Sequence, residues 1–140
     1  MASSEVPGFI DTNVFVHALT RDSLSRECTR FLAALEDGHL SARMHPLVLH
    51  ELTYALRHYL RDPTQNEIAD YLLAILAWPG IMGEKGLMAA AVGRWRARRA
   101  LGFVDAFLIE EALAQGAGVY TKNLRDFRGL GLELPDPLIG

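Results

Sequence analysis

Two kinds of hydrophobic pattern alternate along the chain. Short apolar runs, which end at turn residues, predict buried strands at 6–10, 40–44 and 81–82. Residues 116–121 are predicted to form a turn that leads into a buried strand, and a further strand is predicted at 132–134. Longer stretches with apolar residues at every third or fourth position predict helices at 13–19, 23–35, 46–60, 64–78, 84–100 and 104–115. Strands that alternate with helices indicate an α/β fold, with a small, mainly parallel sheet covered on both faces.

Several residues mark where these elements begin and end. Ser23 and Thr64 are expected to cap helix N-termini, and Pro46 stands at the favoured first position of its helix. Gly38 is expected to end the helix that starts near Ser23. Pro7 weakens the start of the first strand.

Four acidic residues interrupt apolar stretches. Asp11 follows Phe9-Ile10, and the other three are Glu51, Asp105 and Asp126. A carboxylate at the edge of a core is costly unless it has a partner. A shared divalent metal ion is the simplest common partner, and Mg²⁺ is the usual choice for oxygen ligands.

Helical phase separates two of these acids from ordinary surface acids. On helix 46–60 the leucines at 49, 52, 56 and 60 form one apolar stripe, and Glu51 lies at its border. On helix 104–115 the expected core face is Leu108, Ile109, Ala112 and Leu113, with Asp105 in its middle. Glu110 and Glu111 fall on the other side of that helix and are expected to be solvated.

Each acid also has a simpler explanation. Asp105 could cap its helix, and Glu51 could pair with Arg57 or His58. Asp126 could be a turn residue. Asp11 is the hardest to explain by packing, so the metal hypothesis depends on the four acids together.

Size and composition are those of one domain, residues 1–140, with half of its residues hydrophobic. The single cysteine, Cys28, excludes an internal disulfide and a cysteine-rich zinc site. The apolar runs are too short for a bilayer, and the N-terminus lacks a signal-peptide pattern, which favours the cytoplasm. No zinc-type histidine spacing or phosphate-binding glycine loop is present.

The net charge of −3 conceals a local excess of positive charge. Arginine outnumbers lysine twelve to two, and Arg94, Arg96, Arg98 and Arg99 lie close together in sequence. Arginine is the better phosphate ligand, so this cluster could contact a nucleic acid. It could equally be a solvated helix face.

Four segments of the chain resemble the PIN-domain nucleases, and in particular the VapC toxins of bacterial toxin–antitoxin pairs. They are Phe9-Ile10-Asp11-Thr12-Asn13-Val14, Glu51-Leu52, Phe103-Val104-Asp105-Ala106-Phe107 and Thr121-Lys122-Asn123-Leu124-Arg125-Asp126-Phe127. The resemblance covers essentially the whole chain. Many relatives carry an acid where this chain has Asn123, which makes Asp126 the least secure of the four acids.

The resemblance implies a three-layer α/β/α domain that cleaves RNA as a Mg²⁺-dependent or Mn²⁺-dependent endoribonuclease. It implies that Asp11 and Asp105 are the principal metal ligands and that Glu51 and Asp126 complete the catalytic acids. Asn13, Thr121, Asn123, Arg98 and Arg99 are then expected on the substrate side of the site. A cognate antitoxin is expected as a partner, with a candidate groove between helices 23–35 and 64–78. A homodimer is a further expectation, and no membrane association is expected.

Two other functions stay open at this stage. A PIN-like nuclease in RNA processing or DNA repair would carry the same acids. A metal-binding receiver domain without hydrolytic activity also clusters acids near strand ends, and Lys122 would suit it. That alternative lacks an aspartate after a convincing third strand.

Overall fold

The computed structural model describes residues 6–60 and 64–136, and the chain divides into two compact units, Met1–Lys85 and Gly86–Gly140. The expected turn at 61–63 lies outside the described residues. Among the described residues, no helix has the length and apolar character needed to cross a membrane.

A small parallel sheet organises the first unit. Strand β1 (Ala42–Arg43) pairs in parallel with β2 (Ile81–Met82), and on its other side Phe9 forms a parallel bridge with Arg43. Backbone hydrogen bonds from Ile10 N–H to Arg43 O (3.0 Å) and from Arg43 N–H to Gly8 O (2.7 Å) hold that bridge. The predicted strand 6–10 is reduced to this one bridge.

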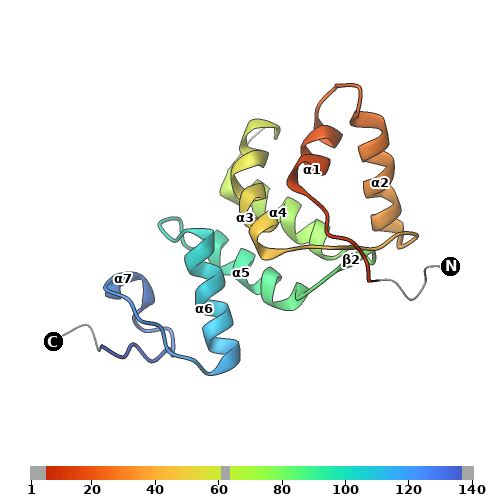
Figure 1. Cartoon of the computed structure of the whole chain (residues 1–140). Coiled ribbons are helices and arrows are strands. Elements are labelled where there is room, and N and C mark those ends of the chain that lie inside the picture. The colour runs from red at the N-terminus through yellow and green to blue at the C-terminus, as the bar shows by residue number, and fades with distance from the viewer. Residues whose placement is uncertain (1–5, 61–63, 137–140) are drawn as a thin grey trace. The chain divides into compact units, whose positions relative to one another are not determined.

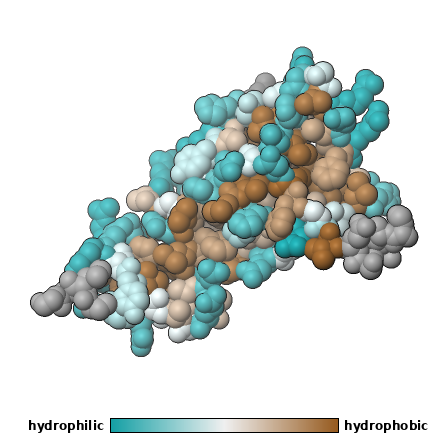
Figure 2. Space-filling view, in the orientation of Figure 1, coloured by the Kyte–Doolittle hydropathy of each residue, from teal (hydrophilic) through white to brown (hydrophobic). Residues whose placement is uncertain are grey.

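The described part of the first unit also contains four α-helices. They are α1 (Thr12–Leu19), α2 (Ser25–Asp37), α3 (Pro46–Ala55) and α4 (Gln65–Leu76), and a 3₁₀ turn, η1 (Leu56–His58), follows α3. Figure 1 shows α1 and α2 side by side. Figure 2 shows hydrophilic side chains over the outward surface of α2, where Arg26, Glu27 and Arg30 are exposed. The helix predicted at 46–60 is thus α-helical only as far as Ala55, and the η1 segment after it is a tighter 3₁₀ turn.

The end signals of these helices are mostly those predicted. Pro46 opens α3, the Thr64 hydroxyl accepts the Glu67 N–H at 3.2 Å, and Gly38 ends α2 with φ +81°. Ser23 is not the cap of α2. The Asp22 carboxylate accepts the Leu24 N–H at 2.9 Å in the loop before α2, so the N-cap position shifts to Leu24, which makes no side-chain cap bond.

Leucine and isoleucine side chains fill the interior of the first unit. Leu49, Leu52 and Leu56 are fully buried, as the predicted stripe requires, while Leu60 is half-buried. Fully burying such a side chain stabilises the fold by about 1.5–3 kcal/mol. Gly80, between α4 and β2, donates its N–H to the Leu35 carbonyl oxygen at 2.8 Å. A Cβ atom at position 80 would lie 2.5 Å from the same oxygen. A side chain at that position would push β2 away from the sheet.

The second unit is helical. It contains α5 (Lys85–Ala97), which starts at the boundary, α6 (Phe103–Gln115) and the short α7 (Leu124–Phe127). The strands predicted at 116–121 and 132–134 do not form, and one hydrogen bond from Val119 N–H to Glu133 O (2.9 Å) joins the two segments. Gly116, with φ +65°, is the C-cap of α6, so the turn forms as predicted. The strand after it does not form, because its formation depends on a distant partner strand that the local pattern does not specify.

The buried face of α6 differs from the predicted one. Phe103, Ala106, Ile109 and Ala112 are buried, whereas Leu108 is 42% exposed. The helix is rotated relative to the expectation because Phe103, its first residue, anchors the buried stripe. Asp105 is consequently half-buried at the margin of that face and not in its middle.

Glu110, predicted to be solvated, instead forms an ion pair inside the second unit. Its Oε1 accepts Arg94 Nε–H at 2.7 Å, and its side chain is only 19% exposed. Glu111 is half-buried as well.

The α/β class and the small parallel sheet that the sequence predicted are confirmed.

Candidate functional site

Asp11 stands at the junction between the Phe9 bridge and α1. Its backbone is extended (φ −95°, ψ 154°), and it is the N-cap of α1, with Oδ1 accepting the Thr12 N–H at 2.8 Å. The positive end of the helix dipole favours a carboxylate at this position. Ile10 beside it is buried, so the chain is anchored immediately before the exposed Asp11 side chain.

Glu51 contacts Thr12, the first residue of the helix that Asp11 caps. It lies on α3 between two residues of the buried stripe, with its side chain exposed, and its Oε2 accepts the Thr12 hydroxyl at 3.1 Å. The two predicted pairings of Glu51 do not form. Arg57 Nε–H instead donates to the Thr53 carbonyl at 3.1 Å, and the His58 ring packs edge-on against Tyr59.

Thr12 therefore connects two carboxylates from different elements. Its backbone N–H donates a hydrogen bond to Asp11, its hydroxyl donates one to Glu51, and its side chain is buried. We call Asp11, Thr12 and Glu51 the Thr12 bridge. Among the described residues neither carboxylate takes part in an ion pair, so the negative charge of the bridge is not compensated by a nearby cationic side chain.

Sequence reasoning did not assign Thr12 a role. The sequence carried no signal for the bond from the Thr12 N–H to Asp11, because an N-cap side chain usually accepts the N–H two or three residues further on. The partner of the Thr12 hydroxyl, 39 residues away, could not be read from the pattern.

Asp105 lies in the first turn of α6 and is half-buried. Gly102 is the N-cap of this helix, so the simpler explanation of Asp105 as a cap is not what the structure shows. A carboxylate in the first turn still interacts favourably with the helix dipole. Its neighbour Val104 is 55% exposed.

Asp126 has a different environment from Asp11 and Glu51. It is buried in α7, where Oδ1 accepts Arg98 Nη2–H at 2.9 Å and Oδ2 accepts Asn123 Nδ2–H at 2.7 Å. Arg98 also donates to the carbonyls of Asp126 (2.9 Å) and Arg125 (3.1 Å). We call Arg98, Asn123 and Asp126 the Arg98 cluster. Its carboxylate charge is balanced within the second unit.

The other predicted substrate residues are spread over both units. Asn13 is exposed in the first turn of α1, and Arg99 is exposed after α5. The Thr121 hydroxyl accepts the N–H of Asn123, a member of the Arg98 cluster, at 2.9 Å, which places Thr121 beside that cluster. Part of the predicted basic rim is thus used internally, because Arg94 binds Glu110 and Arg98 binds Asp126.

The Thr12 bridge has the donor chemistry of a magnesium ligand set. Mg²⁺ is commonly held by one or two carboxylates, with water and substrate phosphate completing its coordination. The bridge supplies two carboxylates and a hydroxyl, all oxygen donors. Within either unit, the described residues contain no group of three or more His, Cys, Asp or Glu side chains arranged around a metal position.

The sequence profile of the PIN domain matches residues 8–131. The chain belongs to the PIN domain family. The matched range includes all four predicted acids, and PIN domains are in general metal-dependent nucleases. Searches of curated proteins and of solved structures gave no significant match.

Proposed function

We propose that this PIN domain is a Mg²⁺-dependent endoribonuclease, with Mn²⁺ as a possible substitute, and that it acts as the toxin of a VapC-like toxin–antitoxin pair. The observation that carries the proposal is the Thr12 bridge. In a chain of a nuclease family, two exposed carboxylates share one buried threonine and have no cationic partner among the described residues.

The proposal assigns a role to each acid. Asp11 and Asp105 are the principal metal ligands, and Glu51 supports the site beside Asp11. Asp126 contributes through water, because both of its carboxylate oxygens already accept a hydrogen bond from Arg98 or Asn123. Direct ligation by Asp126 would require the loss of one of those donors.

The bound metal ion would activate water and neutralise charge on the scissile phosphate. A carboxylate of the site that is not fully engaged in ligation accepts the proton of the attacking water. Attack on phosphorus would break the bond to the 3′ oxygen, which takes a proton from solvent, so the products would carry a 5′ phosphate and a 3′ hydroxyl. Asn13, Thr121, Asn123 and Arg99 are proposed to position the RNA, with Arg98 acting through Asp126.

The test is cleavage of total cellular RNA by the purified protein with Mg²⁺, with chelator, and with Asp11→Asn. Discrete fragments are expected from the wild-type protein with Mg²⁺, and none from Asp11→Asn or with chelator. Asp37→Asn is the matched control, since Asp37 is an exposed carboxylate at the end of α2. Cleavage that persists in Asp11→Asn would contradict the proposal.

The toxin role predicts a partner. Expression of the wild-type chain alone should arrest growth, and expression of Asp11→Asn should not. A protein that is encoded beside this chain, binds it and relieves the arrest would be the antitoxin. RNA cleavage without growth arrest would favour the alternative of a nuclease in RNA processing. The same purified protein shows by light scattering whether it forms the proposed homodimer.

A further inference from the structure

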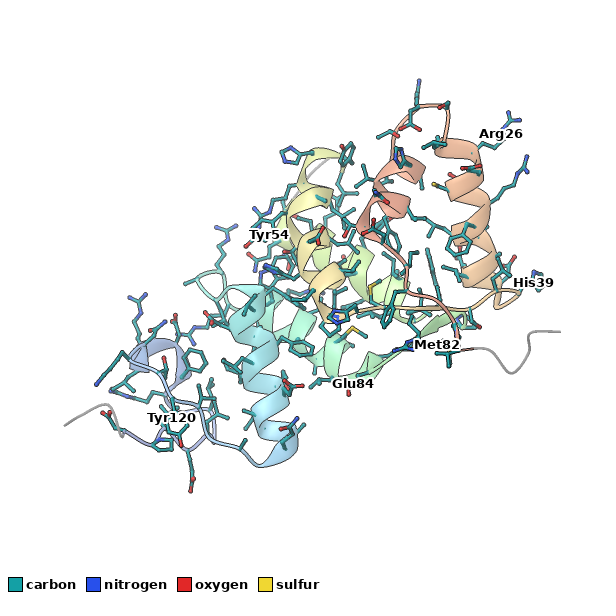
Figure 3. The ribbon with its side chains drawn as sticks, in the orientation of Figure 1. Arg26, His39, Tyr54, Met82, Glu84 and Tyr120 are labelled. Atoms are coloured by element: carbon teal, nitrogen blue, oxygen red, sulfur yellow. The ribbon has the colours of Figure 1, made fainter. Side chains whose placement is uncertain are left out.

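The first unit contains a pocket that the catalytic acids do not use. Its volume is about 300 Å³, and its walls come from the chain beside the Phe9 bridge and just after β1 and β2. Phe9, Arg43, His45 and Glu84 supply its aromatic and charged side chains. We call it the Phe9 pocket. Figure 3 shows Met82 at β2, Glu84 directly before α5, and Arg26 on α2.

Phe9 gives the pocket a stacking surface. Its side chain is 57% exposed although it lies in the paired part of the chain, because Ile10 and not Phe9 points into the core. The Arg43 guanidinium lies 4.2 Å from the centre of the Phe9 ring, and the His45 ring meets Phe9 edge-on with centres 5.8 Å apart. Aromatic rings and guanidinium planes are the surfaces on which proteins stack unpaired bases.

The polar groups of the pocket include both donors and an acceptor. His45 caps α3 through Nδ1, which accepts the Leu47 N–H at 3.0 Å. In the neutral ring the proton is therefore on Nε2, which remains available as a donor. Arg43 is a second donor, and the Glu84 carboxylate is an acceptor.

This combination of groups selects a class of ligand. A phosphate would be repelled by Glu84, and a purely apolar group would bury Arg43 and Glu84 without partners. The Arg43 guanidinium lies over the Phe9 ring, so the two form one stacked pair on which a nucleobase can stack with its π-face. A nucleobase also has acceptors for His45 and N–H groups for Glu84. A nucleobase therefore offers a group of matching chemistry to each of these side chains.

We propose that the Phe9 pocket binds one unpaired nucleobase of a single-stranded RNA substrate. The inference rests on the proposed ribonuclease function. Phe9 is two residues before Asp11, and two extended residues span at most about 7 Å. A base on Phe9 therefore belongs to a nucleotide adjacent to the phosphate at the Thr12 bridge, and the pocket contributes to where the RNA is cut.

The test measures binding of fluorescein-labelled octauridylate by anisotropy, in chelator, so that the RNA is not cleaved. Phe9→Leu keeps the apolar bulk and removes the π-face, and should weaken binding by about fivefold or more. Tyr59→Leu is the control, since Tyr59 is an exposed aromatic residue in the same unit. Equal affinities of Phe9→Leu and wild type would overturn the proposal.

A second variant tests the same pocket independently if Phe9→Leu does not fold. Arg43→Lys keeps the charge and loses the planar guanidinium, so it should also weaken binding, whereas Arg26→Lys on α2 should not. A labelled abasic oligomer of the same length separates base from backbone. Phe9→Leu and wild type should bind it equally, and an equal loss for both oligomers would assign the pocket to the backbone.

The cleavage assay keeps this proposal separate from the ribonuclease proposal. Asp11→Asn should lose cleavage and retain the contribution of Phe9 to binding. Phe9→Leu should retain metal-dependent cleavage at saturating RNA and change the positions of the cuts. Cut positions that are identical in Phe9→Leu and wild type would overturn the assignment of the pocket while leaving the ribonuclease intact.

Discussion

The Thr12 bridge and the Arg98 cluster show two ways in which a protein accommodates carboxylates beside a core. In the Thr12 bridge, Asp11 and Glu51 are exposed and accept hydrogen bonds from the neutral N–H and hydroxyl of Thr12. In the Arg98 cluster, Asp126 is buried and bonded to a guanidinium. The first arrangement leaves negative charge available to a cation, and the second one neutralises it.

The comparison distinguishes carboxylates without an ionic partner, which we propose as metal ligands, from a carboxylate that is paired with a guanidinium, although these acids look alike in sequence. All four candidates interrupt apolar stretches, and that context alone does not reveal the partner. A buried carboxylate requires a charged partner, whereas an exposed one needs only to be oriented. The predictions below use this difference, from the largest expected effect to the smallest.

Arg98→Ala should destabilise the protein most, because it leaves Asp126 buried without its counter-charge. The expected loss in the free energy of unfolding is about 2 kcal/mol, below the 3–5 kcal/mol of a fully buried pair, since the Arg98 side chain is 38% exposed. Urea denaturation measures it. Arg125→Ala is the control, because Arg125 is 85% exposed and 3.9 Å from Asp126, and should cost less than about 0.5 kcal/mol.

The double variant Arg98→Met, Asp126→Leu sharpens the same point. If the cluster is structural, removing both charges should restore much of the stability lost in Arg98→Ala. A double variant that is no more stable than Arg98→Ala would show that the Arg98 cluster does not act as a charge pair.

Thr12→Val should affect function more than stability. Valine keeps the shape of the threonine side chain and the backbone N–H that donates to Asp11, and it removes the hydroxyl that donates to Glu51. The stability loss should be about 1 kcal/mol, the usual worth of one hydrogen bond. Cleavage should fall clearly below that of Thr12→Ser, which keeps the hydroxyl. Equal activity of the valine and serine variants would remove Thr12 from the site.

The smallest effect concerns the loop between α1 and α2. The hydrogen bond with His17 (2.7 Å), and a second one from Thr20 (2.8 Å), lower the pKa of the exposed Asp22 carboxyl. The stability that this carboxylate contributes is therefore present above its unfolded pKa and is lost as the pH falls through its lower folded pKa.

Thermal unfolding of wild type and Asp22→Asn as a function of pH checks this loop. The wild-type protein should be slightly more stable near neutral pH, and the difference should vanish in strong acid. A difference that grows as the pH falls would reverse the expected sign.

The sequence predicted the first unit better than the second. Helix ends near Pro46, Gly38 and Thr64 depend on local chemistry, and in the structure these ends lie at the positions that the sequence pattern predicted. The strands at 116–121 and 132–134 were wrong, because strand formation depends on distant partners that a local pattern does not specify.

The candidate site shows the same limit. Asp11 was identifiable from a strand that ends in an acid, and its cap of α1 is a local interaction. The Thr12–Glu51 bond spans 39 residues and the Arg98–Asp126 bond spans 28, so neither was visible in the pattern. The apolar context of the four acids marked them as candidates in the sequence, but it did not show what each one binds.

The most direct test of the account is metal binding by the intact protein. Calorimetric titration with Mg²⁺, and with Mn²⁺ as a second probe, would compare wild type, Asp11→Asn and Asp126→Asn. We predict that Asp11→Asn weakens binding by at least about tenfold, while Asp126→Asn has a much smaller effect. Metal binding that depends on Asp126 and is unchanged in Asp11→Asn would contradict the assignment of the Thr12 bridge as the metal site.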